Sequence, residues 1–399
     1  MQPLSQRVGR IGPSQTVAID TRYKQMLASG IDVLSLGAGE PDLPMPAVAA
    51  EAAAQSLRDG KTRYTSVTGL PELRAAIAEK FHRDNGIDCG PEDVLVTNGA
   101  KHAIFNALLA LVEDGDEVII PAPYWTTYPE LVRFLGGRPV LAATEPERGF
   151  KLLPEQLAEL ITPRSKALIL NSPGNPTGAA YTREELTALG EVILRHDLNV
   201  ISDEIYEHIT YGEFRHTSLA SLSPELAGLT ATVNGMSKSF AMTGLRIGYV
   251  TAPKSWLAAM SAIQSHGTHH PANVSQYAAL ACLTRGLDFL PTMRSHFDKA
   301  RQFTWSRLAG LQDLKPFSPQ GAFYAFCDIR RILAKAVQSH PEIETSLDLS
   351  RFLLERGRLA TVPGSAFGCE GWLRLSFANS TDYLAKALDR LAESLRSLA

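Results

Sequence analysis

The feature that most constrains the fold is an alternation of short apolar runs with longer helical patterns between about residues 46 and 285. The short runs are rich in Val, Ile and Leu, and each is long enough to cross a sheet once. Continuous apolar strands separated by helices predict a mostly parallel sheet that is covered on both faces and has right-handed crossovers. Seven strands are expected, at 94–97, 117–120, 138–143, 166–171, 199–203, 229–234 and 246–251.

From about residue 290 the pattern changes. Helices are expected around 290–310 and at 348–357, with strand-like segments at 321–328, 359–364 and 372–378 and a closing helix. A chain of 399 residues exceeds what one core usually supports, so we expect a large domain over 46–285 and a smaller α+β domain over 286–399. Residues 1–45 contain one helical piece (17–29) and one short strand (32–36). This is too little for a core, so they are expected to pack as an arm on the small domain or on a partner subunit.

Composition excludes several classes of function. Hydrophobic residues make up 45% of the chain and charged residues 20%, as in ordinary globular proteins. The net charge is −3 with no basic block, which argues against nucleic acid or an anionic membrane as the main partner. The sequence has no run of about 18 apolar residues, and its start lacks the apolar core of a secretory signal. The four cysteines form no C-x-x-C pair, which favours free thiols in the cytoplasm over disulfides or a zinc site.

Polar residues follow the predicted strands, where ligands of an open parallel sheet bind. Asn98, Gly99, Ala100 and Lys101 open a helix after the first strand, which suits a phosphate, although a plain tight turn fits as well. Tyr124 and Trp125 follow the second strand and could stack on a planar ring or fill the core.

The segment NSPGNPTG (171–178) is more specific, because its prolines and glycines predict a rigid turn that fixes Asn175. Asp203 ends a buried apolar strand, which is costly unless the acid meets a positive partner. A protonated pyridine nitrogen would be such a partner, and Tyr206 is spaced to reach the same ring. A helix N-cap would explain Asp203 alone but not the whole set.

The segment VNGMSKSFAMTGLRIGY (233–249) places Lys238 among small residues, eight positions before Arg246. A lysine that forms an imine with an aldehyde cofactor needs small neighbours and a nearby fixed cation for the cofactor's phosphate. Arg374 lies inside the apolar segment WLRLSFA (372–378) and needs an anionic partner if buried. An internal ion pair and a substrate carboxylate would serve equally well.

Together these segments resemble the fold-type I pyridoxal-phosphate (PLP) enzymes, specifically the class I aminotransferases of the bacterial aspartate aminotransferase subgroup. The resemblance covers nearly the whole chain and is carried by PSQTVAID (13–20), LGAGEPD (36–42), KTRYTSVTG, PYW, NSPGNPTG, SDEIYEH, SKSFAMTGLRIGY, PQGAFY and LRLSF. It implies an α/β fold with a mostly parallel seven-stranded sheet in the large domain and a smaller α+β domain. It also implies PLP as the cofactor, no metal, and a homodimer with its two sites at the subunit interface.

The resemblance also implies residue roles. Lys238 forms the imine and then acts as general acid and base for the 1,3-proton shift, while Asp203 pairs with the pyridinium nitrogen. Tyr206 and Asn175 hydrogen-bond the ring oxygen. The remaining cofactor contacts are Trp125 on the ring and, around the phosphate, Gly99, Ala100, Lys101, Ser237, Arg246 and Tyr64 of the partner subunit. Arg374, Asn175 and the backbone of Gly39 are expected to bind the substrate α-carboxylate, and Lys101 and Thr16 its distal carboxylate. Trp125 is expected to contact the substrate as well.

The sequence departs from the family pattern at two places. Many members have a serine where this chain has Gly235, and the segment 267–276 lacks the arginine with which animal-type enzymes bind the distal carboxylate. Lys101 and Thr16 are expected to replace that arginine. His269 and His270 are unusual at their positions and could face the substrate or lie at the dimer interface.

The expected reaction is ping-pong transamination between aspartate or glutamate and a 2-oxo acid, either 2-oxoglutarate or oxaloacetate. Aromatic, prephenate, alanine or methionine aminotransferase activity is the alternative. A PLP C–S lyase and a non-catalytic PLP sensor domain are more remote, since one fold can serve several functions.

Overall fold

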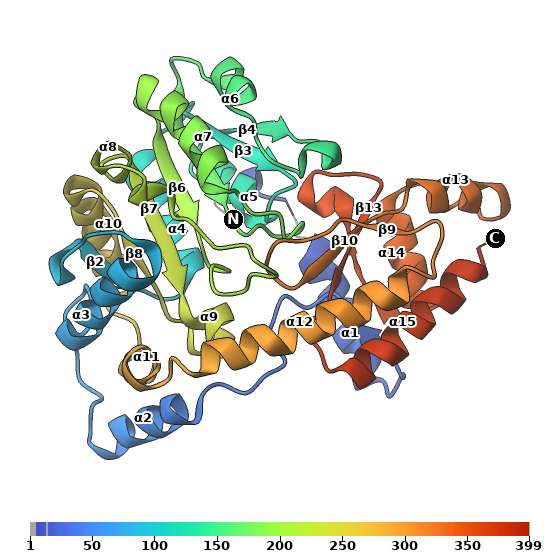
Figure 1. The fold of residues 1–399 in the computed structure, drawn as a ribbon, viewed down its shortest axis with the longest axis horizontal. Coiled ribbons are helices and arrows are strands. Elements are labelled where there is room, and N and C mark those ends of the chain that lie inside the picture. Colours follow the sequence, from blue (N-terminus) through green and yellow to red (C-terminus); the bar gives the residue numbers. More distant parts are fainter. Residues whose placement is uncertain (1–4, 13–14, 399) are drawn as a thin grey trace.

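The structure, a computed structural model, describes residues 5–12 and 15–398 and places two domains side by side (Figure 1). The large domain is built on a sheet of strand order β2-β8-β7-β6-β5-β3-β4. Only the contacts of β8 with β2 and β7 are antiparallel, so the prediction of a mostly parallel seven-stranded sheet is confirmed. The strands are β2 (Val94–Thr97), β3 (Glu117–Ala122), β4 (Arg138–Ala143), β5 (Ser165–Asn171), β6 (Asn199–Asp203), β7 (Thr230–Gly235) and β8 (Gly248–Thr251).

Helices cover both faces of this sheet, because successive strand residues point to opposite sides. Val118 and Ile120 face a cluster with α4, α5 and α10, whereas Ile119 faces a cluster with α6 and α7. Further along that second face, α2, α3 and α11 cover β2 and β8. The helices are α2 (Ala47–Arg58), α3 (Pro71–Lys80), α4 (Ala100–Leu111), α5 (Thr127–Phe134), α6 (Pro154–Leu160), α7 (Arg183–Arg195), α8 (Pro224–Ala227), α9 (Met236–Ser239), α10 (Lys254–Gly267) and α11 (Asn273–Arg285).

The small domain has an antiparallel sheet of order β12-β13-β10-β9 and a parallel pair of β1 with β11. Ile19 and Met26 of the N-terminal helix α1 pack against Leu354 and Ala360, so α1 belongs to this domain. The elements are α1 (Gln15–Ala28), β1 (Leu34–Ser35), α12 (Phe289–Leu308), β9 (Lys315–Pro316), β10 (Tyr324–Asp328), α13 (Arg330–Ser339), α14 (Ser346–Glu355), β11 (Leu359–Ala360), β12 (Val362–Pro363), β13 (Trp372–Ser376) and α15 (Thr381–Arg396).

Helix α12 connects the two domains and runs from beside α11 to α15 (Figure 1). At its start, Phe289 stacks on Phe240 of the large domain with ring centroids 6.2 Å apart. Two turns later, Phe297 contacts Phe323 of the small domain, with centroids 5.2 Å apart. The helix therefore has a side chain in each core, which fixes the domains around the space between them.

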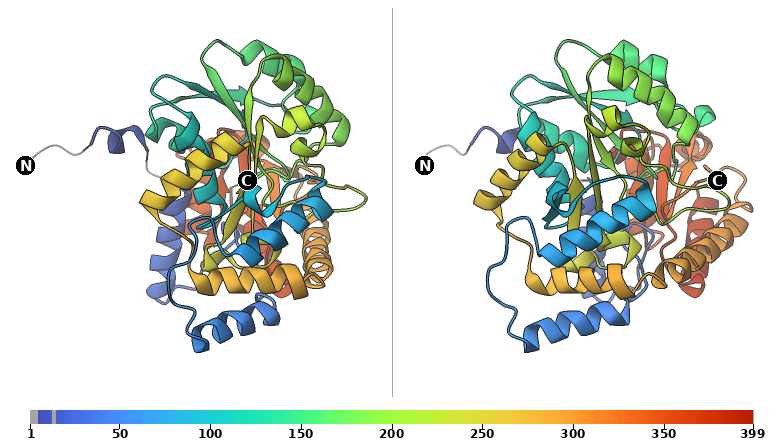
Figure 2. Two further views of the ribbon diagram at one scale, coloured as in Figure 1. Left: turned by 90° about the vertical axis from the view of Figure 1, so that its left-hand side faces the viewer. Right: turned by 60° about the vertical axis from the view of Figure 1, so that its left-hand side comes forward.

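The described part of the N-terminal arm crosses to the large domain. Gly12 donates its N–H to Glu130, and Arg10 pairs with Asp114. Figure 2 shows this segment standing out from the body of the molecule. Residues 13 and 14 of the expected segment 13–20 lie outside the described residues.

Two expected strands begin later than their sequence patterns suggest. Strand β8 starts at Gly248 rather than at Arg246, and β10 starts at Tyr324 rather than at residue 321. Arg246 has a φ of 50° and Ala322 a φ of 57°. A left-handed residue cannot continue a strand ladder, and the sequence pattern does not reveal this conformation in non-glycine residues. Among the described residues, no helix combines the length and the apolar character needed to cross a membrane.

Candidate active site

A cavity of about 500 Å³ lies where the carboxyl ends of the parallel strands face the small domain. It collects side chains from segments that are far apart in the sequence. Of the predicted site residues, the following line it: Thr16, Gly39, Ala100, Lys101, Trp125, Asn175, Asp203, Tyr206, Ser237, Lys238, Arg246 and Arg374. Gly99 borders it through contact with Arg246.

Asp203 is the acid at the floor of the cavity. It ends the buried strand β6, is 3% exposed, and accepts a 2.6 Å hydrogen bond from the Tyr128 hydroxyl. Burial raises the pKa of Asp203 to about 6, although the hydrogen bonds from Tyr128 and from the N–H of Ile205 oppose the shift. A carboxylate held this way is ionised near neutral pH and still lacks a full counter-charge.

Lys238 lies in the short helix α9 and extends its amine into the same cavity, where Nζ donates to the carbonyl of Gly39. Burial lowers the pKa of Lys238 to about 8, with Glu40 opposing the shift and Arg374 and Arg246 adding to it. A substantial fraction of this amine is therefore neutral near pH 8, and a neutral amine can act as a nucleophile or as a base.

The start of α4 and Arg246 form a cradle with no room for further side chains. A Cβ atom on Gly99 would lie 2.5 Å from Nη2 of Arg246, and one on Gly248 would lie 2.4 Å from the backbone nitrogen of Ala100. Gly99 has a φ of 88°, which a glycine adopts without strain. The first N–H groups of a helix and a fixed guanidinium, brought together in this way, suit a phosphate.

Arg374 is the buried cation on the small-domain side. It is 5% exposed, and its guanidinium donates to Oδ1 of Asn175 at 2.9 Å and to the carbonyl of Gly37 at 2.7 Å. Its Nε is buried without a hydrogen-bond partner, and no carboxylate among the described residues pairs with it. The internal ion pair that the sequence allowed is therefore not formed with any described residue, which leaves a buried positive charge facing the cavity.

Comparison with known proteins agrees with this geometry. The model of the family "Aminotransferase class I and II" matches residues 31–394. The chain belongs to this family. It is 44% identical to the aspartate aminotransferase of Geobacillus stearothermophilus, over 99% of this chain and 100% of the relative. It is also 44% identical to the aspartate/prephenate aminotransferase of Cereibacter sphaeroides, over 97% of each chain.

Solved structures give the same result. The aspartate aminotransferase of Thermus thermophilus with maleate superposes with a TM-score of 0.92 at 42% identity, covering 99% of this chain and 100% of the other. The Rhizobium meliloti enzyme superposes with a TM-score of 0.95 at 42% identity, covering 99% of both chains. The protein is thus an aminotransferase, which moves an amino group between an amino acid and an oxo acid.

One predicted site residue of this aminotransferase lies outside the cavity. Tyr64 is 87% exposed and contacts His269 and His270, with ring centroids 5.2 and 5.8 Å away. The prediction assigned Tyr64 to the site of a partner subunit, so its position away from this chain's own cavity does not conflict with that assignment.

Sequence reasoning missed several residues of the site. Tyr128 holds Asp203, Tyr324 lies 2.8 Å from the Tyr206 hydroxyl, and Asn171 bonds both the carbonyl of Asp203 and the N–H of Asn175. Asn171 was visible as the first residue of the segment 171–178. Tyr128 lies in a helix where an aromatic residue is expected to fill the core, so no sequence signal set it apart. Tyr324 ends the segment PQGAFY, which carried the family resemblance, but the sequence assigned it no role in the site.

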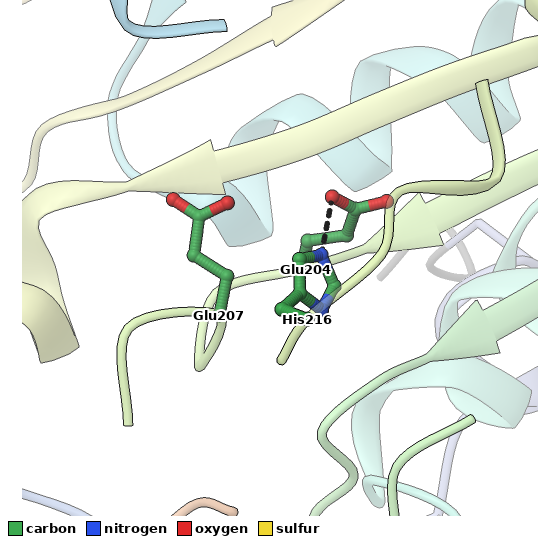
Figure 3. Close-up of side chains that lie close together, drawn as sticks. All are labelled: Glu204, Glu207 and His216. Carbon is green, nitrogen blue, oxygen red and sulfur yellow. Dashed lines mark hydrogen bonds and ion pairs between the residues drawn. The ribbon is translucent and has the colours of Figure 1, made fainter. Parts of the chain in front are cut away.

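A buried polar cluster lies next to the segment that carries Asp203 and Tyr206. Figure 3 shows three of its members, Glu204, Glu207 and His216, with His216 hydrogen-bonded to Glu204 at 2.9 Å. Lys80 pairs with Glu207, and Asn85 donates to both carboxylates. The ligand atoms of the three residues in Figure 3 lie within 4.8 Å of one another, as in a metal site, but their carboxylates already accept hydrogen bonds from these basic and amide groups.

The cluster couples its stability to pH. Burial opposes the charge on Glu207, but Lys80 and His208 outweigh it and hold its pKa well below the usual value. The stabilisation from Glu207 is therefore present above its unfolded-state pKa and is lost as the pH falls through the folded-state value. Burial lowers the pKa of His216, but Glu204 outweighs that effect and the net shift is upward. The stabilisation from His216 is therefore present at low pH and is lost as the pH rises through its folded-state pKa.

Removing one charge from this cluster should destabilise the protein. We expect Lys80→Met to lower the free energy of unfolding by about 3–5 kcal/mol at neutral pH, because Glu207 is left buried without its ion pair. The double variant Lys80→Met/Glu207→Met should recover a large part of that loss, since an apolar pair replaces an ionic one. Urea unfolding followed by circular dichroism measures both. Equal losses in the single and double variants would contradict this account.

Proposed function

We propose that this chain is a PLP-dependent aminotransferase that transfers the amino group of aspartate or glutamate to a 2-oxo acid by a ping-pong mechanism. The observation that carries the proposal is the meeting of the half-buried amine of Lys238, the buried acid of Asp203 and the buried guanidinium of Arg374, which has no carboxylate partner among the described residues, in one cavity. The names of the relatives, aspartate and aspartate/prephenate aminotransferase, support the choice of substrate.

The residues present fit PLP. The cradle of Gly99, Ala100 and Arg246 suits its phosphate, because added Cβ atoms would fill that space. Asp203 would pair with a protonated ring nitrogen, and this positive charge would offset the cost of burying the carboxylate. Trp125, with the Lys101 ammonium 4.8 Å from its ring centroid, would cover one face of the ring.

Bound PLP supplies an aldehyde and a protonated ring that withdraws electrons from the substrate Cα. The protein's own groups do the rest. Nζ of Lys238, which donates a hydrogen bond to the carbonyl of Gly39, takes the proton from Cα. It then donates this proton two atoms away, which completes the 1,3-proton shift. Its pKa of about 8 lets it hold and release a proton near neutral pH.

Arg374 would bind the substrate α-carboxylate. Its guanidinium is kept in place by Asn175 and the carbonyl of Gly37, and its buried Nε remains available for an anion. Lys101 and Thr16 line the cavity as well and would bind the distal carboxylate. Although much of Lys101 faces solvent, desolvation of its amine and the charge of Arg246 lower its pKa, and an incoming carboxylate would offset both effects.

The proposed enzyme works as a homodimer. Tyr64 of the partner subunit would complete the phosphate site, which fits the 87% exposure of this tyrosine. Prephenate is a second candidate substrate. The aspartate/prephenate aminotransferase of Cereibacter sphaeroides, 44% identical over 97% of this chain, favours it.

Lys238→Ala should abolish the reaction. We expect a loss of at least about 10⁴-fold in turnover, because both the nucleophile and the base are removed. The wild-type protein should be yellow, and borohydride should attach the cofactor to the peptide that contains Lys238, as mass spectrometry can show. Lys254→Ala, which alters an exposed lysine at the start of α10, is the control. A Lys238→Ala variant that still transaminates would refute the mechanism.

Arg374→Ala should lower kcat/KM for every amino acid by about 100-fold or more, since the α-carboxylate is common to all of them and loses a charge-assisted pair. Arg351→Ala, an exposed arginine of the same domain, should leave kcat/KM unchanged. A loss confined to dicarboxylic substrates would instead assign Arg374 to the distal carboxylate.

Lys101→Ala should discriminate between substrates. We expect kcat/KM to fall about 10-fold or more for aspartate and glutamate and little for alanine, because only the first two carry a distal carboxylate. Steady-state kinetics with the three amino acids measures this difference. Equal losses for all three would place Lys101 at the phosphate rather than at the substrate.

A further inference from the structure

Tyr324 of the small domain contacts Tyr206 of the large domain, the residue proposed to hydrogen-bond the cofactor's ring oxygen. Its hydroxyl lies 2.8 Å from the hydroxyl of Tyr206, and the two side chains are 1% and 4% exposed. Tyr324 belongs to β10 of the small domain, whereas Tyr206 follows β6 of the large domain. Both side chains line the cavity.

The same tyrosine supports Arg374. The guanidinium carbon lies 4.5 Å from the Tyr324 ring centroid, an attractive placement for a cation over an aromatic face. A second ring, that of Phe367, lies 5.0 Å from the same carbon. The polar tip of Tyr324 therefore contacts the proposed ring-oxygen ligand, and its face contacts the proposed carboxylate ligand.

The backbone around this contact is held from both domains. Ala322 donates its N–H to the carbonyl of Ile209, and Tyr211 donates its N–H to the carbonyl of Gln320. Gly39 leaves the space for the hydroxyl, because a Cβ there would lie 2.8 Å from Tyr324 Oη. The position of Tyr324 relative to Tyr206 is thus set by the segments on either side of it.

The direction of the hydrogen bond follows from the chemistry of the two groups. Each hydroxyl has one proton, and burial raises the pKa of both tyrosines, so both stay protonated near neutral pH. If Tyr206 gives its proton to the ring oxygen, Tyr324 must be the donor to Tyr206. A donor bonded to a hydroxyl oxygen makes that hydroxyl a stronger donor in turn.

We propose that Tyr324 is a positioning residue for transamination, whose hydroxyl donates to Tyr206 and whose ring supports Arg374. One side chain of the small domain then aligns the ligand of the cofactor's ring oxygen and the ligand of the substrate carboxylate. This inference rests on the proposed function.

The test is the pH titration of the bound cofactor's visible absorbance band in the purified holoenzyme. Tyr324→Phe removes one hydroxyl and keeps the ring. A weaker hydrogen bond from Tyr206 leaves more negative charge on the cofactor's ring oxygen. That oxygen then holds more tightly the proton it shares with the nitrogen that joins Lys238 to the cofactor. We expect the pKa of the band to rise by about 0.3 unit or more.

A double-mutant cycle shows whether the effect passes through Tyr206. In a Tyr206→Phe background, Tyr324→Phe should cause no further shift of the band. Tyr181→Phe removes another buried hydroxyl, one that accepts the N–H of Leu152 and does not line the cavity, and should leave the band unchanged. Gly39→Ala, which displaces the Tyr324 hydroxyl without removing it, should shift the band in the same direction as Tyr324→Phe.

Two results would overturn the proposal. One is a Tyr324→Phe band that titrates as in the wild type, and the other is a shift that persists in the Tyr206→Phe background. Should Tyr324→Phe fail to fold, Gly39→Ala decides the question by the same titration. Failure of the proposed function is distinguishable, since the wild-type protein would then show no cofactor band to titrate.

Discussion

The buried charge of Arg374 is the constraint on which the rest of the site depends. Moving a guanidinium out of water is costly unless an anion or several hydrogen bonds replace the lost solvent. This protein supplies two oxygen acceptors and two aromatic faces but, among its described residues, no carboxylate. The charge is therefore only partly compensated, and under the proposed function a carboxylate substrate would bring the missing anion.

The segment that follows β6 has to satisfy two environments at once. Asp203 and Tyr206 line the cavity, whereas Glu204 and Glu207 belong to the buried cluster with Lys80. Because both carboxylates of the cluster are held by several donors, the backbone between them has little freedom. The cluster thereby fixes the direction in which Asp203 and Tyr206 point, although none of its described members lines the cavity.

The sequence was informative where polar residues interrupt an apolar pattern. Asp203 and Arg374 stand out because a charge in a buried strand needs a partner, and Lys238 because its neighbours are small. The strands of the large domain were predictable from the apolar runs themselves. The predicted runs agree with β3 to β7 within two residues at each end. The roles of Tyr128 and Tyr324 were not predictable, because their hydroxyl partners lie 75 and 118 positions away and their rings resemble ordinary core residues. The left-handed backbone at Arg246 was not predictable either, because a non-glycine residue gives no sequence signal for it. The closeness of the Arg246 guanidinium to Gly99 is a tertiary contact, which the sequence does not reveal.

The charges around the cavity bear on how Lys238 would serve as both nucleophile and base in the proposed reaction. Among the described lining residues, five are cationic and three are acidic, and the pair of Asp20 and Lys24 lies at the exposed edge. Arg374 and Arg246 disfavour a proton on Lys238, while Glu40 and Asp203 favour one. Binding of a phosphate at Arg246 and of a carboxylate at Arg374 would cancel the repulsion from these two guanidinium groups and raise the proton affinity of the amine. Because the cofactor's phosphate would stay bound throughout, only the carboxylate at Arg374 would come and go. Lys238 would thus be the better nucleophile while that site is empty and the stronger base once a substrate fills it.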